Sequence, residues 1–277
     1  MDGMATESTI EWLRPQRADG SLMPGHTGNL WWGCEEVHAG CRECYARKWA
    51  NRHHKDKRLW DPERARRLVI KSIWDNLRSW QRAAQKAGEM HRVFGSMMDI
   101  YEKSMATVDW LDKDVYHEVE GVSVPLTTGF LRDRYLQTVV PATPNLWHLL
   151  LTKRPSNILK FSPPEWRTAP PQNVMFGTSI SEPANLRLLD LLRAVPGRRF
   201  VSLEPQIAYI PELDLTGIDW LIVGGESGGL RRPFNPDWAR RLRDISREQG
   251  VPFFMKQWDK VQPVPADLLI HEFPAYA

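Results

Sequence analysis

The chain contains three cysteines, and they lie within eleven residues as Cys34, Cys41 and Cys44. An odd and tightly clustered set does not suit disulfide pairing, so it indicates a bound metal or metal cluster in a reducing compartment. Three thiolates fill three positions of such a centre and leave one position open for a reacting ligand. The spacing therefore predicts a metal site with a chemical role.

Two kinds of metal centre fit these ligands. Zinc could take the three cysteines together with His38, which gives a complete Cys3His set. A [4Fe-4S] cluster would take the three thiolates alone, and its open iron could chelate the amino and carboxylate groups of S-adenosylmethionine. Reduction of the cluster then splits the sulfonium and yields a 5′-deoxyadenosyl radical, which abstracts hydrogen from a substrate.

The elements that must position the cysteines are indicated by short apolar runs that alternate with helical patterns. No run exceeds eight residues, and each is apolar nearly throughout, as in strands buried on both faces of a parallel sheet. The runs are 91–97, 145–152, 173–180, 199–203, 219–223 and 251–256. The alternation predicts βαβ units with right-handed crossovers, and therefore an α/β fold.

Three helices between these runs have clear start signals. One is predicted over 183–195 and one over 235–250, the latter beginning at Asn235-Pro236-Asp237. Asp61-Pro62-Glu63 predicts the start of the third, which ends at Gly88. Its apolar stripe consists of Ile70, Ile73, Trp74, Leu77, Trp80 and Ala84.

Polar residues follow all six predicted strands. Because the carboxyl ends of parallel strands meet at one edge of a sheet, these residues predict a shared polar cavity. They are Ser96, Asp99, Glu102, Thr152, Lys153, Arg154, Gly177, Thr178, Ser179, Ser202, Glu204, Gly224, Gly225, Glu226, Ser227, Lys256 and Gln257. In the glycine-rich run 224–229, backbone amides could approach a ligand and Glu226 could accept hydrogen bonds from an amine or ribose, although a tight turn is the alternative.

Two groups of basic residues each have two possible roles. Lys153 and Arg154 could bind a carboxylate or phosphate, or they could pair with Glu204. The stretch from Arg47 to Arg67 holds nine basic residues interleaved with tryptophans. It could follow a phosphate backbone while its aromatic rings stack on bases, or it could be a solvated helix face.

The position of the cysteine loop distinguishes the two metal centres. The loop follows an apolar run at 28–32 and precedes a helix that begins near Tyr45. It is therefore expected at the carboxyl end of a first strand, where it faces the polar residues. A structural zinc site has no need of that position, whereas a catalytic cluster does, so the position favours the cluster.

The 277 residues are expected to form one domain, with irregular arms at 1–26 and 259–277 and an insertion or lid at 101–140. The net charge of +3 does not by itself indicate nucleic acid. No apolar run reaches the roughly 20 residues that span a bilayer, and the first ten residues lack the features of a secretion signal. A cytoplasmic protein without membrane partners is expected.

Several motifs, in chain order, resemble those of one known family. They are Ile10-Glu11-Trp12, Gly33-Cys34-x6-Cys41-x2-Cys44-Tyr45-Ala46, Leu151-Thr152-Lys153-Arg154-Pro155, Phe176-Gly177-Thr178-Ser179, Ser202-Leu203-Glu204-Pro205, Val223-Gly224-Gly225-Glu226-Ser227-Gly228 and Pro252-Phe253-Phe254-Met255-Lys256-Gln257-Trp258. This pattern resembles the phage Gp37/Gp68-like, or three-Cys-motif (DUF5131), family over nearly the whole chain. The family in turn resembles divergent radical S-adenosylmethionine enzymes, whose usual spacing is Cys-x3-Cys-x2-Cys. Here the first gap is six residues, and Glu43 stands where an aromatic residue usually precedes the last cysteine.

The resemblance implies a partial (β/α) TIM-type barrel in which the three cysteines hold the [4Fe-4S] cluster. Together with the strand ends, it makes Lys153, Glu204 and Glu226 the catalytic candidates. The candidates for binding S-adenosylmethionine are Asp99, Thr152, Arg154, Thr178, Ser179, Ser202, Gly224, Gly225 and Glu226.

The phage setting of the family, the basic stretch after the cysteines and the large insertion favour a nucleic-acid or nucleotide substrate, with base modification or repair as the reaction. A flavodoxin or ferredoxin is the expected reductant. Two alternatives remain, which are a Cys3His zinc-binding nucleic-acid module without catalysis and a radical enzyme that acts on a peptide or small metabolite.

Overall fold

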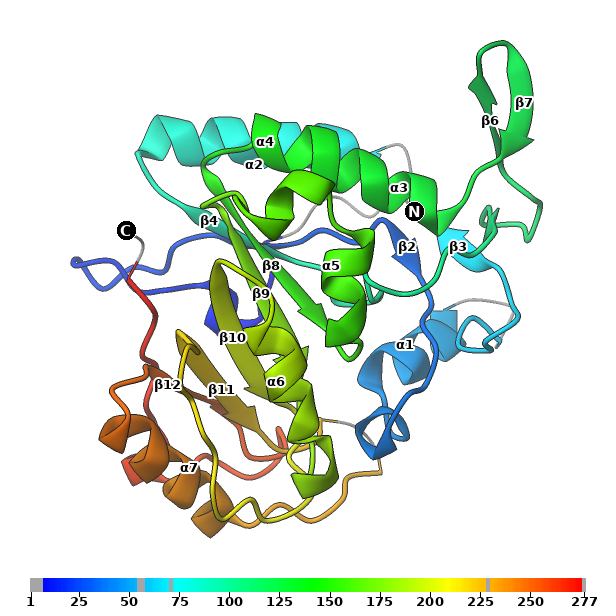
Figure 1. Ribbon diagram of the computed structural model, residues 1–277. Coiled ribbons are helices and arrows are strands. Elements are labelled where there is room, and N and C mark those ends of the chain that lie inside the picture. The colour runs from blue at the N-terminus through cyan, green and yellow to red at the C-terminus, as the bar shows by residue number, and fades with distance from the viewer. Residues whose placement is uncertain (1–6, 54–57, 70–71, 228–229, 276–277) are drawn as a thin grey trace.

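The computed structural model describes residues 7–53, 58–69, 72–227 and 230–275. Its centre is a sheet of seven parallel strands that curls into a half-barrel (Figure 1). In spatial order the strands are β1 (Gly25–Thr27), β4 (His91–Phe94), β8 (Leu146–Thr152), β9 (Val174–Ser179), β10 (Arg198–Leu203), β11 (Trp220–Gly224) and β12 (Phe253–Gln257). The α/β class is confirmed, and the six predicted strands are each found to within three residues at either end.

Helices cover the outer side of this sheet (Figure 1). They are α2 (Ser72–Ala87), α3 (Thr128–Arg134), α4 (Val140–Ala142), α5 (Ile158–Phe161), α6 (Arg187–Arg193) and α7 (Pro236–Glu248). The helix α1 (Tyr45–His53) instead lies beside the cysteine loop. Among the described residues there is no helix long and apolar enough to cross a membrane.

Each strand of the half-barrel buries both of its faces. In β8, Leu146 and Leu150 pack outward in the cluster that contains the helix residues Leu77 and Leu131. The alternate residues Trp147 and Leu149 pack inward, as does Trp12 from the N-terminal segment. Because side chains alternate along a strand, burial on both sides accounts for strands that are apolar nearly throughout.

Both chain ends are largely irregular in their described parts, and they pack on the concave side of the sheet. The Trp12 ring lies 4.8 Å from the ring of Phe94 and 6.1 Å from that of Trp220. The Trp220 indole N–H donates to the Glu272 carbonyl oxygen at 2.9 Å. Residues 1–6, 276 and 277 lie outside the described residues.

The first strand differs from its prediction, because the run 28–32 does not form one strand. The main sheet takes residues 25–27 as β1, and the chain then enters a small sheet through β2 (Trp31–Trp32). The partners of β2 there are β3 (Arg66–Leu68) and, beyond it, β5 (Thr107–Val108). The cysteine loop therefore follows β1 by way of this small sheet.

The segment 101–140 divides into two parts. Its first part holds β5 and a projecting hairpin of β6 (Tyr116–Val119) and β7 (Val122–Pro125), as an insertion would (Figure 1). Its second part is the helix α3, followed by a π-helical turn over Tyr135–Val139 and by α4. Because Leu131, Tyr135 and Leu136 are buried in the outer core, this part is the crossover between β4 and β8.

No helix begins at Asp61, so that prediction was wrong. Residues 58–64 instead form turns around the guanidinium of Arg66, which donates to the carbonyl oxygens of Leu59, Asp61 and Arg64 at 2.8–3.1 Å. The described helix begins at Ser72, while Ile70 of the predicted stripe lies outside the described residues. A buried charge thus overrides a favourable local start signal.

Candidate functional site

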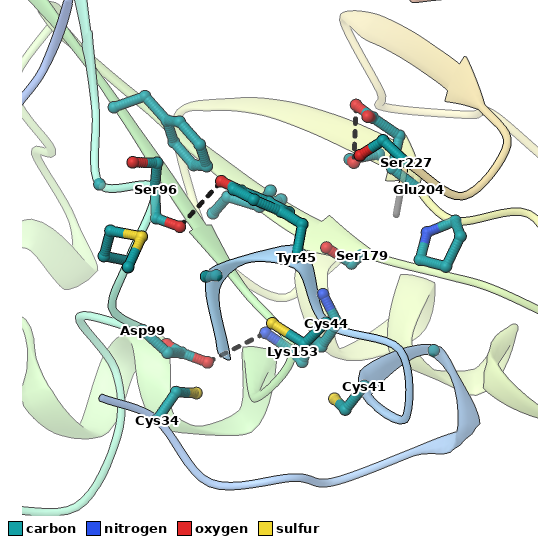
Figure 2. Close-up of a pocket in the computed structure, with 18 of the residues that line it drawn as sticks. Cys34, Cys41, Cys44, Tyr45, Ser96, Asp99, Lys153, Ser179, Glu204 and Ser227 are labelled. Carbon is teal, nitrogen blue, oxygen red and sulfur yellow. Dashed lines mark hydrogen bonds between the residues drawn. The ribbon is translucent and has the colours of Figure 1, made fainter. Parts of the chain in front are cut away.

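A cavity of about 180 Å³ lies at the carboxyl ends of the half-barrel strands. The cysteine loop forms one wall, and residues at the carboxyl ends of β4, β8, β9, β10, β11 and β12 form the others (Figure 2). All three cysteines line this single cavity. The polar residues that line it include Ser96, Asp99, Thr152, Lys153, Ser179, Ser202, Glu204, Glu226, Ser227, Lys256 and Gln257.

The cysteine loop is built from local signals on either side of the thiols. Gly33 adopts a φ of +123°, and a Cβ there would lie 2.5 Å from the Leu59 carbonyl oxygen, so this turn requires glycine. The Gly33 amide donates to the Met97 carbonyl oxygen at 3.1 Å. His38 then caps a short 3-10 helix over Ala39–Cys41 through its ring nitrogen Nδ1, which accepts from the Gly40 amide at 3.1 Å. These backbone contacts therefore shape the loop on either side of the thiols.

Arg154 fastens the first end of this loop to the sheet. One of its terminal nitrogens donates to Asp99 Oδ2 at 2.9 Å and to Cys34 Sγ at 3.7 Å. The other donates to the carbonyl oxygen of Glu35 at 2.9 Å. The guanidinium is thus fully engaged between the strand ends and the first cysteine, which gives Arg154 a positioning role.

The carboxylate of Asp99 holds these residues together through four hydrogen bonds. Its Oδ2 accepts from the Thr152 hydroxyl at 2.9 Å and from the Lys153 amide at 3.2 Å, in addition to Arg154. Its Oδ1 accepts from the Tyr101 amide at 3.0 Å. Although the predicted cofactor contact Asp99 lines the cavity, its carboxylate is therefore committed to holding the strand ends together.

The charge around Cys34 is set by the same residues. Burial raises the pKa of the Cys34 thiol well above its usual range, and the carboxylates of Asp99 and Glu102 raise it further. The Arg154 guanidinium opposes this rise in pKa. The thiol is therefore protonated at neutral pH, and Arg154 is the group placed to stabilise a thiolate there.

Arg232 fastens the other side of the loop. Its backbone amide and Nε both donate to Glu226 Oε2 at 3.0 Å, and Nη2 donates to the second carboxylate oxygen. Its Nη1 donates to the carbonyl oxygen of Ala39 at 2.9 Å. Glu226, which is 5% exposed, thereby holds the arginine that joins the loop after β11 to the cysteine loop.

The geometry of His38 bears on its use as a metal ligand. Burial lowers the pKa of His38 to about 4, and the positive charges of Lys153 and Arg154 contribute to the decrease. Because Nδ1 accepts from Gly40, the proton of the neutral ring lies on Nε2, which is buried and forms no hydrogen bond among the described residues, although the Ser179 backbone lies close enough to raise the pKa. Metal binding through Nε2 would require the other tautomer and would break the Gly40 bond.

The described part of the chain contains no group of three or more His, Cys, Asp or Glu side chains that could hold a metal ion. In Figure 2 the three sulfur atoms are separated around the lower wall of the cavity. The arrangement is therefore not that of a closed site for a single ion.

Of the predicted catalytic and cofactor-binding residues, most line the cavity and three do not; of the wider polar set, Glu102 and Gly177 do not line it either. The three that do not are Arg154, Thr178 and Gly224. Thr178 is fully buried and donates to the Thr152 carbonyl oxygen at 3.0 Å. Gly224 lies behind Gln257 and Glu204. Gly225 lines the cavity, but a Cβ there would lie 2.0 Å from the Trp258 carbonyl oxygen, so its small size serves packing as well.

Sequence reasoning missed Arg232, whose only signal is that it follows the glycine-rich run. It also treated the stretch from Arg47 to Arg67 as one surface. Arg66 and Arg67 are buried, the former against Glu102 and the latter between the rings of Trp32 and Trp110. Lys55 and Lys57 of this stretch lie outside the described residues. A continuous basic surface over this stretch is therefore not found.

The comparisons with known proteins give one result. A family described as "Protein of unknown function (DUF5131)" matches the chain over residues 8–267. No curated protein and no solved structure matches it. The match includes the cysteine loop and every strand of the half-barrel, and the chain thus belongs to the DUF5131 family.

Proposed function

We propose that the protein is a radical S-adenosylmethionine enzyme whose Cys34, Cys41 and Cys44 hold a [4Fe-4S] cluster, and that its half-barrel is a partial TIM-type barrel of that kind. The proposed substrate is a nucleic acid or nucleotide. When bound, the reduced cluster would supply the electron that splits S-adenosylmethionine and starts hydrogen abstraction.

One observation carries this proposal, which is that all three cysteines line one cavity at the carboxyl ends of a parallel half-barrel. Thiolates that bind a cluster attach to three different iron atoms, so they need not converge on one point. Separated thiols that face a shared cavity suit this requirement. Arg154 holds this loop at Glu35 and Arg232 holds it at Ala39, and both contacts keep the thiols in position.

The charged residues of the cavity outside the cysteine loop have separate proposed roles. Lys153 lines the cavity, and its ammonium has no partner among the described residues, so it is the cation placed to meet the carboxylate of S-adenosylmethionine. Glu204 lines the opposite side from Cys34 in Figure 2 and is the acid that faces the substrate. Glu226 acts by positioning Arg232, because three N–H donors of that arginine already occupy its carboxylate.

The proposed nucleic-acid substrate is supported by the surface next to the cavity mouth. Tyr45 and Trp49 of α1 are both 43% exposed and stand just after the cysteine loop. The Trp49 ring already stacks on His53 at 4.1 Å, so the exposed ring of Tyr45, on the same helix as basic side chains such as Arg52, is the face offered to a base. This support comes from α1, not from the whole stretch of residues 47–67.

The deciding experiment is anaerobic purification and reconstitution, with iron, sulfide and zinc measured on the same sample. The expected result is about four iron and four sulfide per chain, with formation of 5′-deoxyadenosine from S-adenosylmethionine after reduction by dithionite. Cys41→Ala should lose both. Cysteine-to-alanine replacement removes a thiolate that no neighbouring cysteine can replace, because the chain contains only three.

The zinc alternative has one favourable observation, which is the unpaired Nε2 of His38. It predicts about one zinc per chain, no iron, and loss of that zinc in His38→Ala. Under the radical proposal, His38→Ala keeps its iron. A preparation with one zinc and no iron or sulfide would overturn the radical proposal.

A further inference from the structure

A β-bulge shapes one end of the cavity. Along the pairing of β12 with β11, Met255 lies opposite Val223 and Gln257 lies opposite Gly224, so Lys256 is the extra residue. Consecutive side chains of a regular strand point to opposite faces. The bulge removes this alternation, and both Lys256 and Gln257 line the cavity.

The side-chain amide of Gln257 has a hydrogen-bond partner for its nitrogen but none for its oxygen among the described residues. Its Nε2 donates to the Gly225 carbonyl oxygen at 2.8 Å, which fixes which way the amide points. The residue is 6% exposed, and its Oε1 has no hydrogen-bond partner among the described residues. Because a buried acceptor without a partner is unfavourable, an N–H donor that a ligand brings to this oxygen would be bound favourably.

Lys256 and Glu204 complete this end of the cavity. The Lys256 ammonium forms an ion pair with Glu204 Oε2 and retains further N–H donors. The other carboxylate oxygen, Oε1, meets only the Ser202 hydroxyl, at the long distance of 3.5 Å. The three residues, here called the β12 subsite, thus offer one cationic donor and two acceptors to a ligand.

We propose that the β12 subsite binds the edge of a guanine base. Guanine presents a carbonyl oxygen next to a ring N–H and an exocyclic amine, which is one acceptor beside two donor groups. Lys256 would donate to the carbonyl, while Glu204 Oε1 and Gln257 Oε1 would accept from the two donor groups. Adenine and cytosine each present one donor group there, and uracil one N–H between two carbonyls, so none of them satisfies both acceptors.

The walls of the cavity suit a flat ring. Trp12, Phe94 and Leu151 also line it, and they belong to or pack against the inner core of the half-barrel. Apolar walls with a few convergent polar groups are typical of small-molecule sites. This proposal rests on the proposed function, which supplies the nucleotide substrate, and it adds the identity of the base.

The test uses calorimetry to measure the equilibrium binding of guanosine, inosine, adenosine and uridine to the full-length protein as isolated. Guanosine is expected to bind at least tenfold more tightly than adenosine or uridine. Inosine keeps the ring N–H and the carbonyl but lacks the exocyclic amine, so it is expected to bind with intermediate affinity. Equal affinity for the four nucleosides, or no binding of guanosine at millimolar concentration, would overturn the proposal.

Two variants and a matched control locate the binding. Gln257→Leu should weaken guanosine binding about tenfold, and Glu204→Gln should do so independently if the first variant does not fold. Gln262→Leu makes the same change at an exposed glutamine and should bind guanosine as the unaltered protein does. Unchanged guanosine binding in both folded subsite variants would also overturn the proposal. Because the assay needs no iron and no S-adenosylmethionine, its outcome is separable from that of the radical proposal.

Discussion

Arg66 and Glu102 form an ion pair whose side chains are both 0% exposed. The guanidinium contacts both carboxylate oxygens and also donates to three backbone carbonyls of residues 59–64. Glu102 lies three residues after Asp99, and its carbonyl oxygen accepts from Arg132 at 3.0 Å. This pair therefore joins the small sheet to the strand end that anchors the cysteine loop.

Replacing Arg66 by methionine should lower the free energy of unfolding by about 3–5 kcal/mol, because it leaves the Glu102 charge buried without a partner. Chemical denaturation measures this change. The control is Arg78→Ala, which breaks the exposed pair with Asp75 and should change the free energy of unfolding by no more than about 1 kcal/mol. A similar small effect for both variants would contradict the structural role given to the buried pair.

The adjacent glycines of β11 and the loop after it give a second prediction. A Cβ on Gly225 would lie 2.0 Å from the Trp258 carbonyl oxygen, whereas a Cβ on Gly224 would have its nearest neighbour at 3.4 Å. Gly225→Ala should therefore destabilise the protein by about 3 kcal/mol, since backbone must move. Gly224→Ala should cost less than about 1 kcal/mol. Denaturation midpoints compare the two, and equal midpoints would contradict this packing.

The contact between Arg232 and the cysteine loop predicts the accessibility of the thiols. Arg232→Ala removes the hydrogen bond to Ala39 and leaves the Glu226 carboxylate without its partner. The alkylation rate of Cys41 and Cys44 should then rise roughly tenfold, as judged by mass spectrometry, because the loop opens more often. Arg240→Ala, which breaks an exposed pair with Asp267, is the matched control and should leave the rate unchanged. No increase in Arg232→Ala would show that the loop is held by other contacts.

The strands were predictable because burial on both faces leaves a simple signal. An apolar run such as 145–151 can hardly be solvated, and the polar residues Thr152 and Lys153 mark where it ends. The cavity followed from the same logic, since the ends of parallel strands must meet at one edge. The cysteines, Lys153 and Glu204 are accordingly found together.

The errors arose where one tertiary contact decided the local structure. The start signal at Asp61 is sound in isolation, yet the buried charge of Arg66 draws the preceding carbonyls into turns. The bulge at Lys256 depends on pairing with β11, which no pattern within β12 indicates. Arg232 is found only through its contacts, since an arginine in a polar loop has no distinctive spacing. Sequence patterns therefore predict the layers of this fold better than the contacts that tie its loops.

The buried residue His148 predicts how stability depends on pH. Its Nδ1 accepts from the Tyr135 hydroxyl at 2.6 Å, while Nε2 contacts the Thr143 hydroxyl, which itself donates to the Val139 carbonyl oxygen. This network suits the neutral ring, and burial lowers the pKa of His148 to about 3. Below an unfolded pKa of about 6.5 the unfolded chain binds a proton that the folded chain excludes. The free energy of unfolding should therefore fall with decreasing pH, by up to about 1.4 kcal/mol per unit from this residue.

Denaturation at pH 7, 6 and 5 measures this slope. His148→Gln should be less stable at pH 7, because the network is broken, but its free energy of unfolding should fall less steeply toward pH 5. His53→Gln makes the same change at an exposed position of α1 and should leave the slope unaltered. A slope that is the same in His148→Gln and in the unaltered protein would mean that His148 does not titrate on unfolding, and the buried neutral ring would then be the wrong description.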